Sequence, residues 1–173
     1  MWKIKVLTIP NRLAARIKLA VFDFDGVFTD NTVWVSKNGQ EAVRCWRGDG
    51  LGINRLKGLD VEVWVLSTEA DPVVKTRCKK LQIQCQTGLK NKRIALEKLL
   101  KKLTISSKET MYVGNDINDV DCLEMVGLPV VVSDATGETK AVAKYITQRP
   151  GGLGVVREVC DWIVACKNYQ KKK

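Results

Sequence analysis

Two aspartates separated by a single residue carry the first candidate chemistry in the chain. Asp23 and Asp25 belong to the segment Asp-Phe-Asp-Gly, which follows a short apolar run. On an extended strand the two carboxylates would point to opposite faces, so a turn after Asp23 is needed to bring both into one pocket. Gly26 permits such a turn because it lacks a Cβ atom. One carboxylate can then attack as a nucleophile while the other moves protons, although Asp and Gly also populate ordinary turns.

Two further segments are suited to binding phosphate. Ser67, Thr68 and Glu69 follow a second apolar run, and a hydroxyl with backbone N–H groups at a strand end can hold phosphate oxygens. Lys92 begins a predicted helix, where an ammonium group can neutralise a phosphate as a point charge. Ordinary loop chemistry for the first segment and a solvated lysine for the second are the alternatives.

A third acidic segment, Gly-Asn-Asp-Ile-Asn-Asp, occupies residues 114–119. Acids after a strand can complete a site made only of oxygen ligands. Mg²⁺ suits such a site because it prefers carboxylates and water in an octahedron. Capping of a following helix by Asp116 or Asn118 is the alternative interpretation.

Strands that alternate with helices must position these groups. Short apolar runs predict the strands, and they occupy residues 17–23, 61–66, 82–86, 110–113 and 129–132. Apolar side chains recur at helical spacing in residues 96–103 and 156–163. Asp71 and Pro72 are typical of a helix start, and Gly127 of a helix end. We therefore expect an α/β fold: a Rossmann-like parallel sheet of about five strands with helices on both faces, whose site lies beyond the carboxyl ends of the strands.

One segment interrupts this alternation. Residues 32–46 contain apolar stretches on either side of Asn38-Gly39, which predicts a β-hairpin flap that carries Trp34 and Trp46. The 173 residues suit a single domain with one core. Within it we expect an N-terminal extension over residues 1–16 and a basic tail over residues 167–173.

Composition excludes several classes of protein. The chain has no histidine, which excludes the usual Ser-His-Asp and Cys-His hydrolases and His-ligated zinc. Its six cysteines form no Cys-x-x-Cys pair, so we expect reduced, mostly buried thiols and a cytoplasmic location. The first 18 residues are basic but interrupted by Pro10 and polar residues, and we expect no signal peptide and no membrane partner.

The positive charge is unevenly distributed. The formal net charge is +10, and residues 75–102 hold ten basic residues against a single acidic one, Glu97. Such a surface can attract nucleic acid or steer a small anion, while most individual lysines are simply solvated. The sequence lacks the aromatic-interleaved basic motif of a nucleic-acid-binding domain, so we expect a small anionic substrate and no nucleic acid.

In its order of motifs, the chain resembles the haloacid dehalogenase-like phosphohydrolase superfamily from about Lys18 to Cys166. The resemblance implies that Asp23 is the nucleophile of an aspartyl-phosphate mechanism and that Asp25 is the general acid and base. It further implies roles for three groups of residues. These are phosphate binding by Ser67, Thr68 and Lys92; Mg²⁺ binding by Asp23, the Asp25 carbonyl and Asp116; and a supporting position for Asn115 and Asp119.

The branch of the superfamily follows from shorter features. The gaps between the motifs are too short for a cap domain. Residues 25–30, 47–53 and 151–158 resemble the capless branch that contains 3-deoxy-octulosonate 8-phosphate phosphatases and nonulosonate (sialic-acid-type) 9-phosphate phosphatases. Members of this branch are tetramers in which neighbours help to form the site. The resemblance therefore implies a homotetramer, with Trp34 at a subunit interface or, alternatively, in the core.

Three residues bear on the substrate. Octulosonate phosphatases typically have Thr-Gly-Arg where this chain has Ser-Thr-Glu, and the departure at Glu69 is shared with nonulosonate phosphatases. Arg77 and Lys80 match basic substrate-binding positions of the latter, with a solvated helix face as the alternative. We expect a Mg²⁺-dependent phosphatase of a 2-keto-3-deoxy sugar-acid phosphate, with the nonulosonate preferred and the octulosonate as the alternative. A tetramerisation domain like that of acylneuraminate cytidylyltransferases is a further alternative.

Overall fold

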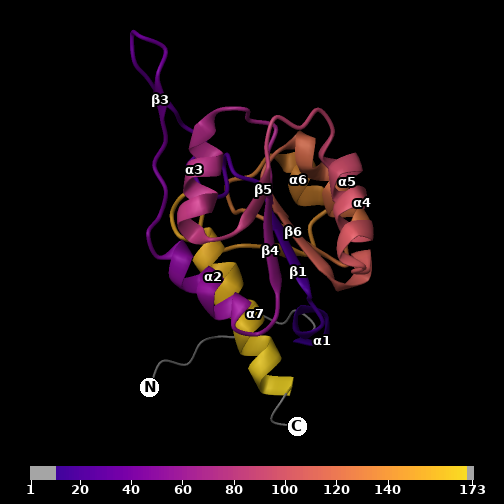
Figure 1. The fold of residues 1–173 in the computed structure, drawn as a ribbon. Coiled ribbons are helices and arrows are strands. Elements are labelled where there is room, and N and C mark those ends of the chain that lie inside the picture. The colour runs from indigo at the N-terminus through magenta and orange to yellow at the C-terminus, as the bar shows by residue number, and fades with distance from the viewer. Residues whose placement is uncertain (1–10, 171–173) are drawn as a thin grey trace.

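A six-stranded parallel sheet forms the centre of the computed structural model, which describes residues 11–170 (Figure 1). The strand order is β5-β4-β1-β6-β7-β8, and every neighbouring pair is parallel. The strands are β1 (Leu19–Phe22), β4 (Glu62–Leu66), β5 (Gln84–Gln86), β6 (Thr110–Gly114), β7 (Leu128–Val131) and β8 (Tyr145–Ile146). The expected parallel sheet is confirmed, with one more strand than the sequence suggested. β8 was missed because two residues are too short to show a period.

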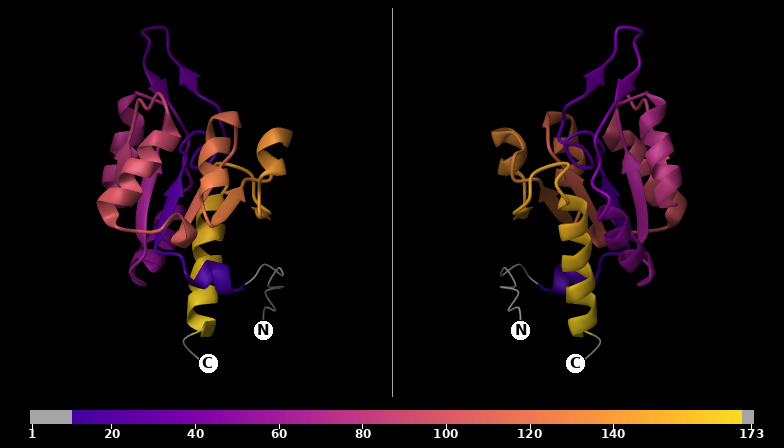
Figure 2. Two further views of the ribbon diagram at one scale, coloured as in Figure 1. Left: turned by 90° about the vertical axis from the view of Figure 1, so that its right-hand side faces the viewer. Right: turned by 90° about the vertical axis from the view of Figure 1, so that its left-hand side faces the viewer.

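Helices cover both faces of the sheet, which explains why its central strands are apolar on both sides. Figures 1 and 2 show α2 (Asp49–Lys57), α3 (Pro72–Leu81) and α7 (Val155–Gln170) in one layer. The other layer contains α4 (Lys92–Leu103), α5 (Val120–Met125) and α6 (Gly137–Ala141). Two short 3₁₀ turns, η1 (Ser107–Glu109) and η2 (Ile117–Asp119), flank β6. No separate cap domain interrupts these layers.

The path of the chain reverses direction across the sheet between β1 and β6. From β1 it moves outward to β4 and β5, and it then crosses back to β6, β7 and β8. Phe22 at the end of β1 pairs with Val65 of β4 and with Val113 of β6, so these three strands end together. In open α/β sheets the crevice at such a reversal is the usual ligand site.

The predicted helix boundaries are partly confirmed. Asp71 caps α3 by accepting a hydrogen bond from the Val73 N–H at 2.8 Å, and Pro72 occupies the first turn. The helix after β6 ends at Met125, two residues before the predicted Gly127. Gly127 instead donates its N–H to the Ser107 carbonyl at 2.8 Å, and a Cβ atom there would collide with the Lys108 backbone.

The hairpin projects from the body beyond the carboxyl ends of the strands (Figures 1 and 2). It consists of β2 (Trp34–Val35) and β3 (Glu41–Ala42), which are antiparallel. The second strand was predicted to reach Trp46, but pairing stops at Ala42. Residues 31–42 are all exposed, and the Trp34 side chain is 75% exposed. Trp34 is therefore not a core residue of this chain.

The first and last described helices lie at the end of the molecule opposite the hairpin (Figure 1). Residues 11–15 of the predicted extension form α1 (Asn11–Ala15), which packs on α7, and Lys167 donates to the Ala15 carbonyl at 3.1 Å. Lys167 lies inside α7, and the rest of the predicted extension and tail, residues 1–10 and 171–173, lies outside the described residues.

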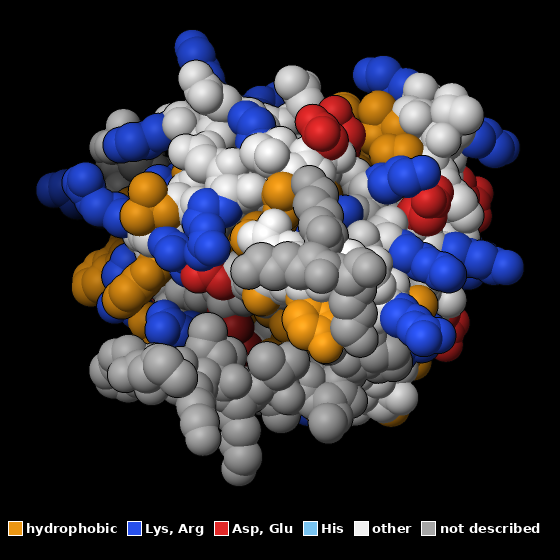
Figure 3. All heavy atoms as spheres, turned by 90° about the horizontal axis from the view of Figure 1, so that it is seen from below, with side chains coloured by type: hydrophobic (Ala, Val, Ile, Leu, Met, Phe, Trp, Pro, Cys, Tyr) orange, Lys and Arg blue, Asp and Glu red, His pale blue; other side chains and the backbone are white. Residues whose placement is uncertain are grey.

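Surface features follow the composition. Seen from this end in Figure 3, Lys and Arg side chains are scattered among acidic and apolar ones. Between residues 11 and 170 no helix has the length and apolar character to cross a membrane. All six cysteines are free thiols, and four of them are buried.

Candidate active site

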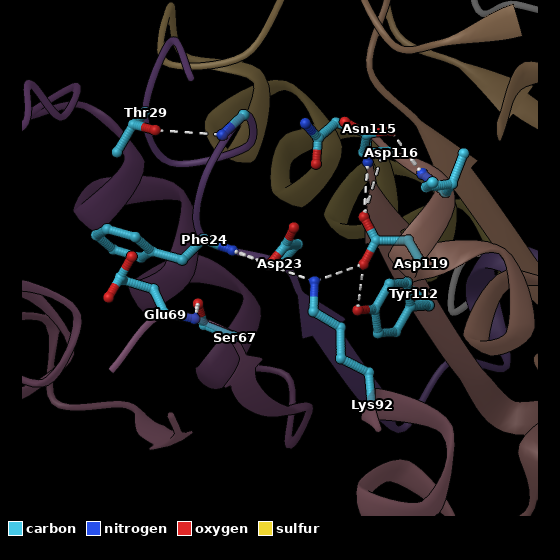
Figure 4. Close-up of polar contacts among 12 residues, drawn as sticks. Asp23, Phe24, Thr29, Ser67, Glu69, Lys92, Tyr112, Asn115, Asp116 and Asp119 are labelled. Atoms are coloured by element: carbon cyan, nitrogen blue, oxygen red, sulfur yellow. Dashed lines mark hydrogen bonds and ion pairs between the residues drawn. The ribbon is translucent and has the colours of Figure 1, made fainter. Parts of the chain in front are cut away.

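A buried ion-pair network lies at the reversal point of the sheet. The Lys92 Nζ is 2.8 Å from the Asp23 Oδ1 and 2.8 Å from the Asp119 Oδ1, and it points between the two carboxylates (Figure 4). Asp23 follows β1, Lys92 opens α4 and Asp119 ends η2, so three distant segments meet here. Lys92 is held at the helix start because Asn91 caps α4 by accepting the Ile94 N–H at 2.9 Å.

Every oxygen of Asp119 has a partner inside the protein. Besides Lys92, its Oδ1 accepts the Tyr112 hydroxyl at 2.8 Å, and its Oδ2 accepts the backbone N–H of Asn115 at 2.9 Å. Gly114 leaves room for this carboxylate, since a Cβ atom there would lie 2.7 Å from its Oδ2. Sequence reasoning missed Tyr112, because a tyrosine within an apolar strand gives no polar signal.

Burial shifts the ionisation of this network. Desolvation raises the pKa of Asp23 to about 8, and the charge of Asp119 adds to the rise, whereas Lys92 and the Phe24 N–H lower it. Desolvation lowers the pKa of Lys92, but its two carboxylate partners raise it by more, so the ammonium form is retained. The carboxyl groups of Asp23 and Asp119 thus share a single ammonium group. A further cation beside Asp23 would favour the ionised form of Asp23.

The Asn115 side chain lies on the other side of Asp23. The Asn115 side-chain amide lies 3.2 Å from the Asp23 Oδ2 and 3.0 Å from the Asp25 carbonyl oxygen. Its nitrogen faces these two oxygens and donates a hydrogen bond to each of them. Gly26 makes this approach possible, because a Cβ atom there would lie 2.0 Å from the Asn115 nitrogen.

These oxygens test the prediction of a magnesium site. Carboxylate, carbonyl and amide oxygens are hard ligands of the kind that Mg²⁺ prefers, and Asp23, the Asp25 carbonyl and the Asn115 amide each supply one here. The residues thus fit Mg²⁺. No cluster of three or more Cys, Asp or Glu side chains that could hold a metal occurs in the described part of the chain, so a site here needs the carbonyl and the amide.

Asp116 caps a short helix in the structure. Its Oδ1 accepts the Ile117 N–H at 2.7 Å, and with Asp119 it forms a capping box around η2. The helix-cap alternative is therefore observed, and Asn115 is the residue placed against Asp23 and the Asp25 carbonyl, while Mg²⁺ binding by Asp116 stays a prediction. Adjacent residues after a strand point in different directions, and sequence spacing did not reveal which one faces the site.

The predicted turn after Asp23 is present. The Phe24 carbonyl accepts the N–H groups of Phe28 at 2.8 Å, Val27 at 3.2 Å and Thr29 at 3.3 Å. Gly26 has a φ of +77°, a conformation that favours glycine, and its N–H donates to the Thr29 Oγ1. Asp25 is half-buried on this turn.

The environment of Asp25 favours its protonated form. Desolvation raises the pKa of Asp25, and the negative charges of Glu69 and Glu41 raise it further, while Lys92 opposes them. A raised pKa makes this carboxyl group better suited to protonate a leaving group.

The predicted phosphate-binding residues differ in accessibility. Ser67 directly follows β4, and it lies near Asp23 because β4 and β1 are neighbouring strands. The Ser67 side chain is almost fully buried. Its Oγ accepts the Glu69 N–H at 3.0 Å, which leaves the hydroxyl hydrogen available to a ligand oxygen. Thr68 is exposed at the mouth of the site.

The predicted substrate-binding residues are not gathered around Asp23. The Glu69 Oε1 accepts the N–H groups of Ala70 at 2.6 Å and Asp71 at 2.8 Å and so holds the start of α3. Arg77 donates to the Trp46 carbonyl at 2.9 Å, and its buried Nε has no partner within the described protein. Lys80 is exposed on the same helix. A cavity of about 400 Å³ lies near this helix, lined by residues 44–48, Gly152 and Leu153.

A Rossmann-like sheet with paired aspartates after its first strand, and a lysine shared with a second acidic loop, defines an aspartate-based hydrolase of the phosphate-transferring kind. Residues 79–159 match the family described as haloacid dehalogenase-like hydrolase. The 3-deoxy-D-manno-octulosonate 8-phosphate phosphatase of Escherichia coli K12 is 38% identical over 152 residues, which cover 87% of this chain and 81% of that enzyme.

Solved structures give the same result. The 3-deoxy-D-manno-octulosonate 8-phosphate phosphatase of Moraxella catarrhalis, in complex with magnesium, phosphate and KDO, has a TM-score of 0.89 at 32% identity and 94% coverage of each chain. A putative hydrolase of the same family from Streptomyces avermitilis has a TM-score of 0.86 at 39% identity, covering 91% of this chain and 95% of that one. The chain belongs to the haloacid dehalogenase-like hydrolase family, and within it to the phosphatases.

Proposed function

We propose that the protein is a Mg²⁺-dependent phosphatase that hydrolyses 3-deoxy-D-manno-octulosonate 8-phosphate through an aspartyl-phosphate on Asp23. The observation that carries the proposal is the sharing of Lys92 between Asp23 and Asp119, beside the Asn115 amide that lies between Asp23 and the Asp25 carbonyl. The substrate is supported by the names of relatives that match most of the chain. For this reason we propose the octulosonate, the alternative in the sequence interpretation, ahead of the nonulosonate.

The residues divide the reaction between them. The Asp23 carboxylate attacks phosphorus, and Lys92 offsets the repulsion between that carboxylate and the phosphate dianion. Asp25 donates its proton to the departing sugar oxygen, and the resulting carboxylate then takes a proton from the water that hydrolyses the aspartyl-phosphate. Ser67 donates its hydroxyl hydrogen to a phosphate oxygen. Asp119 holds Lys92 through the 2.8 Å ion pair.

The metal would be held by the Asp23 Oδ2, the Asp25 carbonyl and the Asn115 Oδ1. When bound, Mg²⁺ supplies positive charge that polarises the phosphoryl group and keeps Asp23 ionised. Asn115 contributes an oxygen without a negative charge, so this set carries one formal charge fewer than one with an aspartate at that position. We therefore expect Mg²⁺ binding that is weakened by removal of Asn115 and not by removal of Asp116.

A second substrate is favoured by one specific feature. Glu69 stands where octulosonate phosphatases typically have arginine, and it acts electrostatically on Asp25 at the mouth of the site. A nonulosonate 9-phosphate, with more hydroxyl groups to donate to Glu69, is the second candidate. Arg77 and Lys80 are proposed to contact the substrate carboxylate in either case.

The assembly is proposed to be a homotetramer. The hairpin and Trp34 are exposed on a chain that has no cap domain, and large exposed apolar side chains on a projecting arm mark interaction surfaces. Neighbouring subunits would then cover the site and place Trp34 in an interface.

The test is phosphate release from the two sugar-acid phosphates, with kcat/KM measured side by side with and without Mg²⁺. Asp23→Asn should abolish release, and persistent turnover in that variant would refute the mechanism. Higher kcat/KM for the octulosonate supports the first substrate. Glu69→Arg should lower kcat/KM on the nonulosonate more than on the octulosonate if Glu69 binds sugar hydroxyls. No turnover of either ester by an intact tetramer would favour a tetramerisation domain.

A further inference from the structure

A glycine-rich segment near the C-terminus packs directly on the turn that carries Asp25. We call residues 24–30 the Asp25 turn and residues 150–154 the glycine turn. The Gly152 N–H donates to the Val27 carbonyl at 3.0 Å, so the backbones of the two turns are hydrogen-bonded. The two segments are more than 120 residues apart in the sequence.

The contact is too close for any side chain at two positions. A Cβ atom on Gly151 would lie 2.1 Å from the Gly26 carbonyl oxygen and 2.9 Å from the Thr29 carbonyl oxygen. A Cβ atom on Gly152 would lie 2.4 Å from the Asp30 nitrogen, and its φ is +67°. All of these atoms belong to the backbone, so a substitution would have to displace the Asp25 turn itself.

Hydrogen bonds also connect the glycine turn and its flanking residues to the rest of the fold. Asp134 accepts the Gly151 N–H at 3.0 Å. Glu158 of α7 accepts the N–H groups of Gln148 at 2.8 Å and Arg149 at 2.9 Å. The buried Asp49 accepts the Arg157 N–H at 3.0 Å, which ties the first turn of α7 to α2. The glycine turn is therefore held at both ends.

We propose that the glycine turn is a positioning element for the reaction. It fixes the position of the Asp25 turn, and with it the position of the Asp25 carbonyl that faces Asp23 and Asn115. The proposal rests on the proposed phosphatase function for its kinetic part only. Gly151 has no side chain that could contact the substrate or the proposed metal ligands. Its effect must therefore pass through the backbone of Gly26 and Thr29.

The sharpest test compares two glycine-to-alanine variants. Gly151→Ala inserts a methyl group against the Asp25 turn, whereas Gly137→Ala inserts one where no atom lies within 4 Å. Neither glycine has a positive φ, so backbone strain does not distinguish them. We expect Gly151→Ala to lower kcat about 100-fold, the cost of a ~1 Å misplacement, and to raise the Mg²⁺ concentration for half-saturation. Gly137→Ala should match the unmodified protein.

A readout independent of turnover separates this proposal from the proposed function. Amide hydrogen exchange over residues 24–30 should be faster in Gly151→Ala and unchanged in Gly137→Ala. Absence of phosphate release by the unmodified protein would refute the phosphatase function and leave the exchange result to decide on the positioning role. Unchanged exchange together with unchanged Mg²⁺ binding by calorimetry in a folded Gly151→Ala would overturn the positioning role.

A second pair of variants serves if Gly151→Ala does not fold. Asp134→Ala removes the acceptor of the Gly151 N–H from an exposed position, and Glu138→Ala removes a carboxylate from a nearby exposed one. We expect a 2- to 10-fold loss of kcat and faster exchange over residues 24–30 in Asp134→Ala only, because about one hydrogen bond is lost. Equal behaviour of the two variants would contradict the proposal.

Discussion

The ion-pair network around Lys92 and the hairpin arm, residues 31–48, differ in how far their side chains are buried. In the network the charged groups are almost fully buried, and each Asp119 oxygen has partners within one chain. The arm is exposed along residues 31–42, and Trp34 is its most exposed large apolar side chain. In the proposed homotetramer the reaction chemistry would be complete within one subunit, whereas the arm would contact another copy. Variants in the two regions should therefore fail in different ways.

The largest expected effect is on the chemistry, at Asp25. Asp25→Asn removes the group that protonates the leaving oxygen, so we expect kcat to fall by about 10²–10⁴-fold. Its backbone carbonyl remains, and Mg²⁺ binding and sedimentation should be unchanged. A drop in tetramer content in this variant would show that the chemistry at Asp25 and the assembly through the arm are coupled.

Next in size is the effect on stability of removing the shared cation. Lys92→Met leaves two buried carboxylates without their ammonium partner, which should cost about 3–5 kcal/mol of unfolding free energy and eliminate turnover. Lys90→Met, two residues earlier on the exposed surface, is the matched control and should cost about 0.5 kcal/mol or less. Urea denaturation measures both, and equal losses would mean that the network contributes nothing to stability.

A smaller effect is expected on the arm, and of a different kind. Trp34→Ser should weaken subunit association by about 2 kcal/mol or more, as expected for a buried interface tryptophan. Sedimentation velocity should then show smaller species, with the thermal stability of the isolated fold retained. Lys37→Ser, also exposed on the arm, should leave the assembly unchanged. A tetramer that survives Trp34→Ser would place the interface elsewhere.

The smallest effect concerns the base of the arm and depends on pH. Burial raises the pKa of Asp49 from 3.8 to about 6, although the Arg157 N–H and the charges of Arg77, Arg149 and Arg157 lower it. The folded state therefore holds this proton more tightly than the unfolded state, and stability from this group is lost as pH rises from about 4 to about 6. Asp49→Asn should lack this loss, on the order of 1–2 kcal/mol. Parallel denaturation curves at pH 4 and pH 7 measure the difference, and an identical pH dependence in both proteins would contradict the assignment.

The sequence by itself determined the parts that depend on local pattern. Apolar runs in which both faces are buried predict parallel strands, and the acids that follow them must lie at one edge of the sheet. Asp23, Ser67 and Lys92 were placed in this way. Gly26 after two aspartates predicted the turn, because few other residues adopt its φ of +77°. The absence of histidine is explained by the same residues, since carboxylates, a lysine and a hard cation can perform the proposed reaction.

Only the tertiary structure decided which neighbouring side chain faces the site. Asn115 rather than Asp116 approaches Asp23, because the orientation after β6 is set by the capping box around η2 and by the space left at Gly26. The same holds for Tyr112 beneath Asp119 and for Gly151 against the Gly26 carbonyl. These contacts join segments that no local period connects, and they exist only once β1, β6 and α7 have packed together.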